Sequence, residues 1–376
     1  MDRTCEKAVR EALFSRYPRR CVDVIIDCSG YRKSSVRSVL DSLQVLVQYI
    51  YISTDSIYEV CVCQSSQNQP TSEEDCLRPT DVSMRRALAS EDRYGNKKKQ
   101  CEEYLQRMCD DGVVPSCTCL RLADVIGPRD NTDRLWHYVL WLKSLEHDGA
   151  MEVIKASSGE RRLSFTFSLD VARLALRCMH ILEESDVGEE SDGARGSGGR
   201  AGCSTGGSTD GTMVYYNVAC SEMPTHAEFV EAIAQCMGTN LKVHSKTKKN
   251  EAGDARRKNQ LTKRTVSYYP STSRGPIDVT KVEALASLSN HKFLLTPLQE
   301  AIRQSVCFLE VAMRNGWNES DSKDVIRSLA DDLNVVREKE REHFLCTLQA
   351  AYGAIGGLKT YPWKKKKKKR NKKQRF

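Results

Sequence analysis

The chain has 376 residues, of which 40% are hydrophobic and 29% are charged, an ordinary composition for a globular chain of two or three domains. No run of 18 or more apolar residues occurs, so the sequence predicts no membrane-spanning helix. The first twenty residues carry charge throughout and lack an apolar core. We therefore expect no secretory signal and a cytoplasmic location.

The net charge of +8 is concentrated at one end of the chain. Residues Lys364 to Phe376 hold ten Lys or Arg and no acid, so the other 363 residues carry 8 − 10 = −2. Such a run stays solvated. The tail Lys364–Arg375 is interpreted as a nuclear import signal or as a nonspecific contact to RNA phosphates. An anionic-membrane patch is disfavoured, because no amphipathic helix or lipidation motif accompanies the run.

Sixteen cysteines are scattered along the chain, and many of them stand in apolar segments. No CxxC pair occurs, and the two CxC pairs (Cys61 with Cys63, Cys117 with Cys119) lack the second pair that a zinc site needs. We predict reduced, buried thiols rather than disulfides or a metal site. Cys61 and Cys63 are interpreted as incidental.

In the first half of the chain, short β-branched runs alternate with segments of helical periodicity. The predicted elements are a strand at Cys21–Cys28, a helix at Ser34–Leu46, a strand at Val47–Ser53, a helix at Tyr94–Asp110, a strand at Ser116–Leu122, a helix at Leu135–Leu145, and a strand at Arg162–Leu169 followed by a helix through Leu182. This alternation is typical of an α/β fold, in which helices flank a parallel sheet.

A segment rich in glycine, Gly188–Gly211, divides the chain and holds nine of its 22 glycines. It cannot bury enough apolar surface to offset its ordering entropy, so we expect a disordered insertion. Its GxGxxA match at Gly196–Ala201 lacks the flanking strand and helix of a dinucleotide site and is rejected. The elements predicted beyond it are a strand at Met213–Ala219, a capped helix at Thr225–Met237, a solvated loop at Lys242–Arg264, and helices at Asp278–Leu288, Thr296–Asn315 and Ser320–Ala351.

One constellation of residues could carry chemistry. Thr54 and Asp55 directly follow a predicted strand, and Tyr94 and Lys98 stand four residues apart in a predicted helix, so their side chains share one helix face. An ammonium beside a phenol lowers the phenol pKa from its usual value of about 10 toward the working range of a base. A hydroxyl at the carboxyl end of a strand, where α/β proteins bind ligands, could orient a substrate oxygen.

The YxxxK pair by itself is weak evidence. Chance produces about one such pair in a chain with 14 tyrosines, and a second pair, Tyr361 with Lys365, is interpreted as accidental. For Thr54 the alternative is a strand-end cap that bonds the backbone. Asp170 is equally well explained as the N-cap of the helix from Val171.

These segments together resemble the extended short-chain dehydrogenases, the NAD-dependent epimerase/dehydratase group. The resemblance rests on VDVIIDCSGY, YIYISTDSIY, YGNKKKQCEEYL, CLRLADVIGPRD and LSFTFSLDVARLAL, across roughly residues 21 to 180, and on PIDVTKVEALAS near Ile277. It implies a Rossmann-like doubly wound parallel sheet and NAD or NADP as cofactor. The first two segments also look like the branch with the chloroplast stem-loop RNA-binding proteins.

The resemblance implies a role for each residue of the constellation. Tyr94 would give or take the hydroxyl proton, Lys98 would bind the nicotinamide ribose, and Thr54 would orient the substrate. The residues assigned in this way are Tyr94, Lys98 and Thr54 for catalysis, Lys98, Tyr94, Ser53 and Val125 for the cofactor, and Asp55 and Arg129 for the substrate side. Ser56 stands where the 4,6-dehydratases carry a glutamate, so dehydratase activity is not expected.

A second departure concerns the cofactor loop. The family opens with a strand, a glycine-rich turn and a helix that holds the pyrophosphate, whereas the twenty residues before the first predicted strand contain no glycine. The chain therefore reads as N-terminally truncated relative to the family. We expect a sheet that lacks its first β-α-β unit, weakened cofactor binding, and an exposed apolar edge.

Two functions follow from these features. The first is an NAD(P)-dependent oxidoreductase or epimerase that acts on a hydroxyl or keto carbon. A nucleotide sugar is the suggested substrate, and assembly into a homo-oligomer is an open alternative. The second is a non-catalytic RNA-binding protein that uses Lys242–Arg264 and the basic tail. The expected regions are a partial dinucleotide-binding domain at 1–183, the disordered insertion at 184–212, a smaller substrate-side region at 213–316, a helical extension at 317–360 and the basic tail at 361–376.

Overall fold

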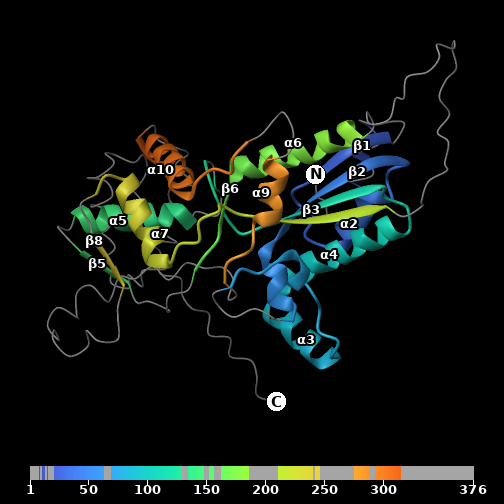
Figure 1. Cartoon of the computed structure of the whole chain (residues 1–376), viewed down its shortest axis with the longest axis horizontal. Helices are drawn as coiled ribbons and strands as arrows, with labels where there is room; N and C mark the ends of the chain where they lie inside the picture. The colour runs from blue at the N-terminus through green and yellow to red at the C-terminus, as the bar shows by residue number, and fades with distance from the viewer. Residues whose placement is uncertain are drawn as a thin grey trace, which may run out of the picture.

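The structure is a computed structural model of the whole chain (Figure 1). Apart from a few isolated residues near the N-terminus, it describes residues 21–62, 69–128, 130, 134–147, 152–155, 162–185, 211–239, 242–245, 275–287 and 293–314. Nearly all of the predicted insertion, the predicted helix Ser320–Ala351 and the basic tail lie outside these residues.

A parallel sheet of four strands forms one half of the fold. Its strands run in the order β1 (Cys21–Asp27), β2 (Val45–Thr54), β3 (Ser116–Leu122) and β7 (Thr212–Val218). Strands rich in β-branched and apolar residues suit a parallel sheet, because helices cover both of its faces. The predicted α/β fold is confirmed.

Helices cover the two faces of this sheet (Figure 1). Helices α2 (Lys33–Leu40) and α4 (Arg93–Asp110) lie on one face, and α6 (Ser168–Ser185) and α9 (Thr280–Ser287) lie on the other. Successive side chains of a strand point to opposite faces. Tyr49 and Tyr51 accordingly pack with α2 and α4, whereas Ile50 between them packs with α6.

The other half of the fold is a helical cluster around a second core (Figure 1). It contains α5 (Arg134–His147), α7 (His226–Cys236) and α10 (Leu298–Arg314), the parallel pair β4 (Asp124–Ile126) with β6 (Phe165–Phe167), and the parallel pair β5 (Glu152–Lys155) with β8 (Lys242–Ser245). The rings of Phe165 and Phe229 stack at this core, with centroids 4.0 Å apart. No helix in the described part of the chain is long and apolar enough to span a membrane.

Three short helices between β2 and α4 were not predicted. They are the 3-10 helices η1 (Asp55–Val60) and η2 (Glu73–Asp75) and the α-helix α3 (Val82–Glu91). Helix α3 buries none of its side chains, so it has no apolar periodicity to reveal it. Asp81 caps it by accepting a hydrogen bond from the N–H of Met84 at 2.6 Å.

Three predicted boundaries were wrong. The predicted helix Ser34–Leu46 ends at Leu40, and its last residues enter β2, because the β-branched run there pairs with β1. The predicted strand Arg162–Leu169 shortens to β6, since α6 begins at Ser168. The predicted loop Lys242–Arg264 begins with β8, which pairs with β5. In each case pairing or packing with distant residues overrides the local pattern.

Asp170 lies inside the first turn of α6 rather than before it. Its carboxylate accepts hydrogen bonds from the backbone N–H of Thr296 at 2.7 Å and from the Thr296 hydroxyl at 2.9 Å. Asp170 therefore joins α6 to the segment that leads into α10.

Strand β1 forms an edge of the sheet. Within the described residues it pairs with β2 alone, and Ile26 near its end is 42% exposed.

A buried ion pair joins the sheet to α4. The Arg121 guanidinium on β3 donates to both carboxylate oxygens of Glu102 on α4, at 3.0 and 3.3 Å. It also donates to the Tyr58 hydroxyl at 3.1 Å and to the Glu73 carbonyl at 3.0 Å. The Tyr58 hydroxyl in turn donates to Asn217 Oδ1 on β7 at 2.6 Å. One network thus connects β3, β7, α4, η1 and η2.

We expect Glu102→Ala to destabilise the fold strongly, because it leaves the Arg121 guanidinium buried without its carboxylate. Loss of one partner of a buried pair costs about 3–5 kcal/mol of unfolding free energy, which chemical denaturation would measure. Glu300→Ala is the control, since Glu300 pairs with Arg303 on the exposed surface of α10 and such pairs contribute little. Equal, small effects for the two variants would contradict this role of the network.

Candidate functional site

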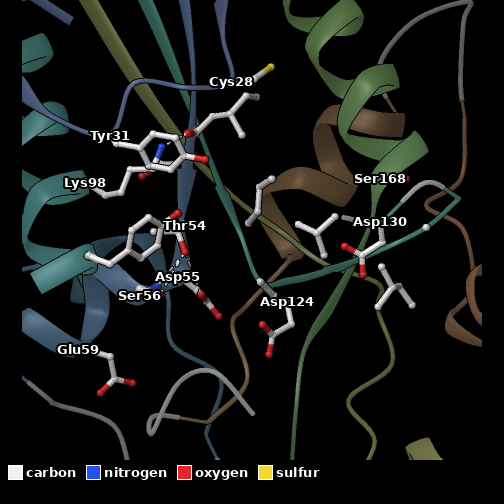
Figure 2. Close-up of a pocket in the computed structure, with 18 of the residues that line it drawn as sticks. Cys28, Tyr31, Thr54, Asp55, Ser56, Glu59, Lys98, Asp124, Asp130 and Ser168 are labelled. Carbon is white, nitrogen blue, oxygen red and sulfur yellow. Dashed lines mark hydrogen bonds between the residues drawn. The ribbon is translucent and has the colours of Figure 1, made fainter. Parts of the chain in front are cut away.

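A pocket of about 900 Å³ opens at the carboxyl ends of β1, β2 and β3 (Figure 2). Its walls come from the last residues of β2, from the residues that follow β1 and β2, from the first two turns of α4, and from the segment 122–128. The carboxyl edge of a parallel sheet is where α/β proteins place their ligand crevices. This pocket is therefore the candidate site.

The start of α4 is held tightly against η1. Asp92 caps the helix by accepting a hydrogen bond from the N–H of Gly95 at 2.8 Å. Gly95 packs so closely that a Cβ there would lie 2.2 Å from the Ser56 carbonyl oxygen. Only glycine permits this approach, and its neighbour Tyr94 lines the pocket.

Tyr94 and Lys98 both line the pocket but differ in exposure. Tyr94 is 44% exposed, whereas Lys98 is 2% exposed. The Lys98 ammonium donates to the Ile52 carbonyl at 2.7 Å and to the Gly30 carbonyl at 3.3 Å. Burial lowers the pKa of Lys98 below its usual value. An ammonium has three N–H donors, and these two carbonyls accept two of them.

Two tyrosine rings enclose the Lys98 ammonium. Lys98 Nζ lies 4.6 Å from the centre of the Tyr51 ring and 5.2 Å from the centre of the Tyr31 ring, within the range of cation–π attraction. Figure 2 shows Tyr31 and Lys98 together at one side of the pocket. The Tyr31 and Tyr94 rings are 6.2 Å apart. Sequence reasoning missed Tyr31, although it stands four residues after the end of β1 and Thr54 ends the neighbouring strand β2.

The Thr54 hydroxyl has a structural role as well as a place in the pocket. Its oxygen accepts a hydrogen bond from the Ser56 N–H at 3.3 Å and caps η1. Its proton has acceptors in Asp55 Oδ1 and Ser56 Oγ, each at 3.3 Å. Thr54 thus caps the backbone at the end of its strand, which was the alternative to a role in substrate binding. The residue also lines the pocket.

Ser53 connects the pocket to the buried ion pair. Its hydroxyl lines the pocket and donates to Glu102 Oε1 at 2.6 Å. Because Glu102 also accepts from Arg121, the orientation of the Ser53 hydroxyl is fixed by the same network that joins α4 to β3.

The pocket lining is acidic. Its described residues include one ammonium, Lys98, and the carboxylates of Asp55, Glu59, Glu91, Asp92, Asp124 and Asp130. In the view of Figure 2, Asp124 and Asp130 lie across the pocket from Lys98. In the described part of the chain, no three His, Cys, Asp or Glu side chains gather in a way that could hold a metal ion. The lining suits a neutral or cationic group better than a phosphate.

The structure brings most of the predicted site together. Tyr94, Lys98, Thr54, Ser53, Val125 and Asp55 all line this one pocket. Arg129, the other predicted residue on the substrate side, lies outside the described residues. Segments from 53 to 125 in the chain thus meet at one edge of the sheet.

Comparison with a family model gives a match to this part of the chain. Residues 34–191 match the NAD dependent epimerase/dehydratase family. The matched segment includes every lining residue of the pocket except Cys28 and Tyr31. The chain matches none of the curated proteins with which it was compared.

Several solved structures are similar to the chain at low sequence identity. UDP-glucose 4-epimerase from Thermotoga maritima, solved with UDP-glucose, is 16% identical, with a TM-score of 0.48 and coverage of 83% of this chain and 84% of that chain. RMD from Pseudomonas aeruginosa, complexed with NADPH, is 12% identical, with a TM-score of 0.49 and coverage of 80% and 84%. The dTDP-glucose 4,6-dehydratase of Bacillus anthracis, in complex with NAD, is 12% identical, with a TM-score of 0.48 and coverage of 83% and 78%.

We expect Gly95→Ala to destabilise the fold, although alanine is favoured over glycine inside a helix by about 1 kcal/mol. The added Cβ would clash with the Ser56 carbonyl and push α4 away from η1. Chemical denaturation would measure the change, with Lys97→Ala, an exposed position on the same helix, as the control. A gain in stability for Gly95→Ala would show that α4 and η1 are not in close contact.

Proposed function

We propose that this chain binds a nicotinamide dinucleotide and acts as an oxidoreductase or epimerase on a hydroxyl or keto carbon. The observation that carries the proposal is the meeting of Tyr94, Lys98 and Thr54 in one pocket at the carboxyl edge of the sheet. A nucleotide sugar is the substrate class that we propose, since the matched family model is that of epimerases and dehydratases.

The pocket residues fit the nicotinamide-ribose end of such a cofactor. The third N–H of the Lys98 ammonium can donate to a ribose hydroxyl, and the Tyr31 ring offers an aromatic surface at the pocket wall. The oxidised nicotinamide ring is a planar cation, which suits a lining rich in carboxylates. When bound, the dinucleotide would supply the hydride acceptor or donor.

The pyrophosphate end of the cofactor has a weaker fit. Within the described lining of the pocket there is no glycine-rich turn at a helix N-terminus, the usual pyrophosphate site of α/β folds. Each charge-assisted hydrogen bond that is missing costs roughly 1.5–3 kcal/mol of binding free energy. We therefore expect the chain to bind a dinucleotide weakly and chiefly through its nicotinamide half.

The proton chemistry assigned to the chain is centred on the Tyr94 hydroxyl. The Tyr94 phenol and the Lys98 ammonium line the same pocket. The Tyr94 phenolate would take the proton of the substrate hydroxyl during oxidation and return it during reduction. The Thr54 hydroxyl would orient the same substrate oxygen. The Ser56 hydroxyl cannot serve as a carboxylate base, so a dehydration step is not part of the proposal.

We expect Tyr94→Phe to lower turnover by about 10²–10⁴-fold, the usual contribution of a positioned acid or base. NADH and NADPH affinity should change little, because the phenol ring remains. Fluorescence titration with NADH and NADPH measures binding, and incubation of UDP-glucose and related nucleotide sugars with NAD⁺ measures turnover. Tyr104→Phe on the same helix, outside the pocket, is the control. Undiminished turnover in Tyr94→Phe, or no binding of either dinucleotide by the wild-type chain, would refute the proposal.

A second candidate function rests on one observation, the basic run Lys364–Arg375. Lysine and arginine side chains that neutralise phosphates release counterions, so the affinity for RNA would fall steeply with salt. Deletion of Lys364–Phe376 should weaken RNA binding and flatten its salt dependence, as measured by filter binding at several salt concentrations. Tyr94→Phe should leave RNA binding unchanged. A deletion variant with the wild-type salt slope would exclude the tail as the contact.

A further inference from the structure

Two cysteines outside the pocket lie in contact with each other. Cys61 follows the last residue of η1 and Cys76 follows the last residue of η2. Their sulfur atoms are 3.6 Å apart, and their exposed fractions are 0% for Cys61 and 8% for Cys76. Sequence reasoning set Cys61 aside as incidental. The fifteen-residue separation from Cys76 matches no thiol motif that would have pointed to this contact.

The surroundings of Cys76 stabilise its thiolate. The hydrogen bond between Cys76 and Cys61 outweighs the effect of burial and lowers the pKa of Cys76 to about 7. The cations of Arg121 and Lys99 also lower it, against the opposing charge of Glu102. Burial alone would lower the pKa of Lys99, but Cys76 and Glu102 raise it above its usual value. Cys76 thus has a lowered pKa and a second thiol in contact.

A second pair of thiols, Cys109 and Cys117, has different electrostatic surroundings. Cys109 and Cys117 are hydrogen-bonded and fully buried. The hydrogen bond with Cys117 lowers the pKa of Cys109 below its usual value. Burial and the charge of Asp110 oppose this shift. Hydrogen bonds to Cys109 and Cys119, together with burial, raise the pKa of Cys117 well above its usual value. No cation is among the groups that set the pKa of Cys109 or Cys117, whereas Arg121 and Lys99 both lower the pKa of Cys76.

We propose that Cys61 and Cys76 are a redox modification site, a thiol pair that a peroxide converts into a reversible disulfide. The Cys76 thiolate attacks one oxygen of the peroxide, the O–O bond breaks, and hydroxide leaves, so Cys76 becomes a sulfenic acid. The Cys61 sulfur then attacks the Cys76 sulfur, its proton joins the departing oxygen, and water leaves. The two electrons lost by the sulfurs have reduced the peroxide, and a dithiol restores both thiols by exchange.

The disulfide would change the wall of the pocket. The sulfur atoms would move from 3.6 Å apart to about 2.05 Å, which ties the end of η1 to the end of η2. Helix η1 begins with Asp55 and Ser56, which line the pocket. The bond would also remove the thiolate charge beside Lys99 and Arg121 and leave Glu102 as their counter-ion. Oxidation would thus act on the network that orients Ser53.

Peptide mapping after peroxide treatment tests the proposal on the full chain. A Cys63→Ser background removes the thiol nearest in sequence to Cys61. Oxidised protein is alkylated with iodoacetamide in denaturant and cleaved after glutamate, and cleavage after Glu59, Glu73, Glu74 and Glu91 puts Cys61 and Cys76 on separate peptides. We expect these two peptides joined with a loss of two hydrogens, and released by dithiothreitol.

Three variants serve as controls. In Cys61→Ser, Cys76 should stop at the sulfenic acid, which dimedone traps. In Cys76→Ser, Cys61 should stay reduced and be alkylated. Cys109→Ser should leave the joined peptides unchanged, because Cys109 belongs to the other thiol group.

The rate of disulfide formation should follow the ionisation of Cys76. It should rise with pH through about 7, and Lys99→Met should shift this rise to higher pH, so the variant reacts more slowly at pH 7. A merely structural effect of Lys99 would change the rate at every pH without moving the midpoint. Full alkylation of both thiols at peroxide doses that oxidise the exposed Cys307 would overturn the proposal, as would a bond from Cys76 to a different cysteine.

Discussion

The buried pair of Glu102 and Arg121 is the interaction on which the geometry of this protein depends. Two opposite charges that are buried away from water must pair with each other. Their pairing holds together the helices and strands that carry them. Here they fix α4 against β3, while the remaining donors of Arg121 hold η1 and η2. The pocket, the Ser53 hydroxyl and the Cys61–Cys76 contact all lie on elements that this network joins.

The electrostatics of the pocket follow from the same arrangement. One cation, Lys98, is withdrawn from solvent by two carbonyls and two tyrosine rings, and carboxylates dominate the rest of the described lining. A ligand that enters meets a phenol and a single ammonium among acids. This favours an uncharged hydroxyl or a planar cation at the reacting end and disfavours phosphate there, which is why the proposed function relies on the nicotinamide half of a dinucleotide.

Much of this fold could be predicted from the sequence, because strands and helices leave different periodicities. Strands β1, β2, β3 and β7 and helices α4 and α7 were located close to their observed bounds. Helix α3 was not predicted, since a helix with no buried side chain has no apolar stripe. Strand β8 was not predicted either, because a short charged strand exists only through its pairing with β5.

The sequence by itself determined the class of fold, the i, i+4 pairing of Tyr94 with Lys98 and the hydroxyls at the carboxyl end of β2, since these depend on residues close together in the chain. Only the tertiary structure decided that Tyr31 encloses Lys98, that Ser53 bonds Glu102, and that Cys61 touches Cys76. These contacts join residues from 15 to 67 positions apart. No local spacing encodes them, because the packing of separate elements against one sheet edge brings them together.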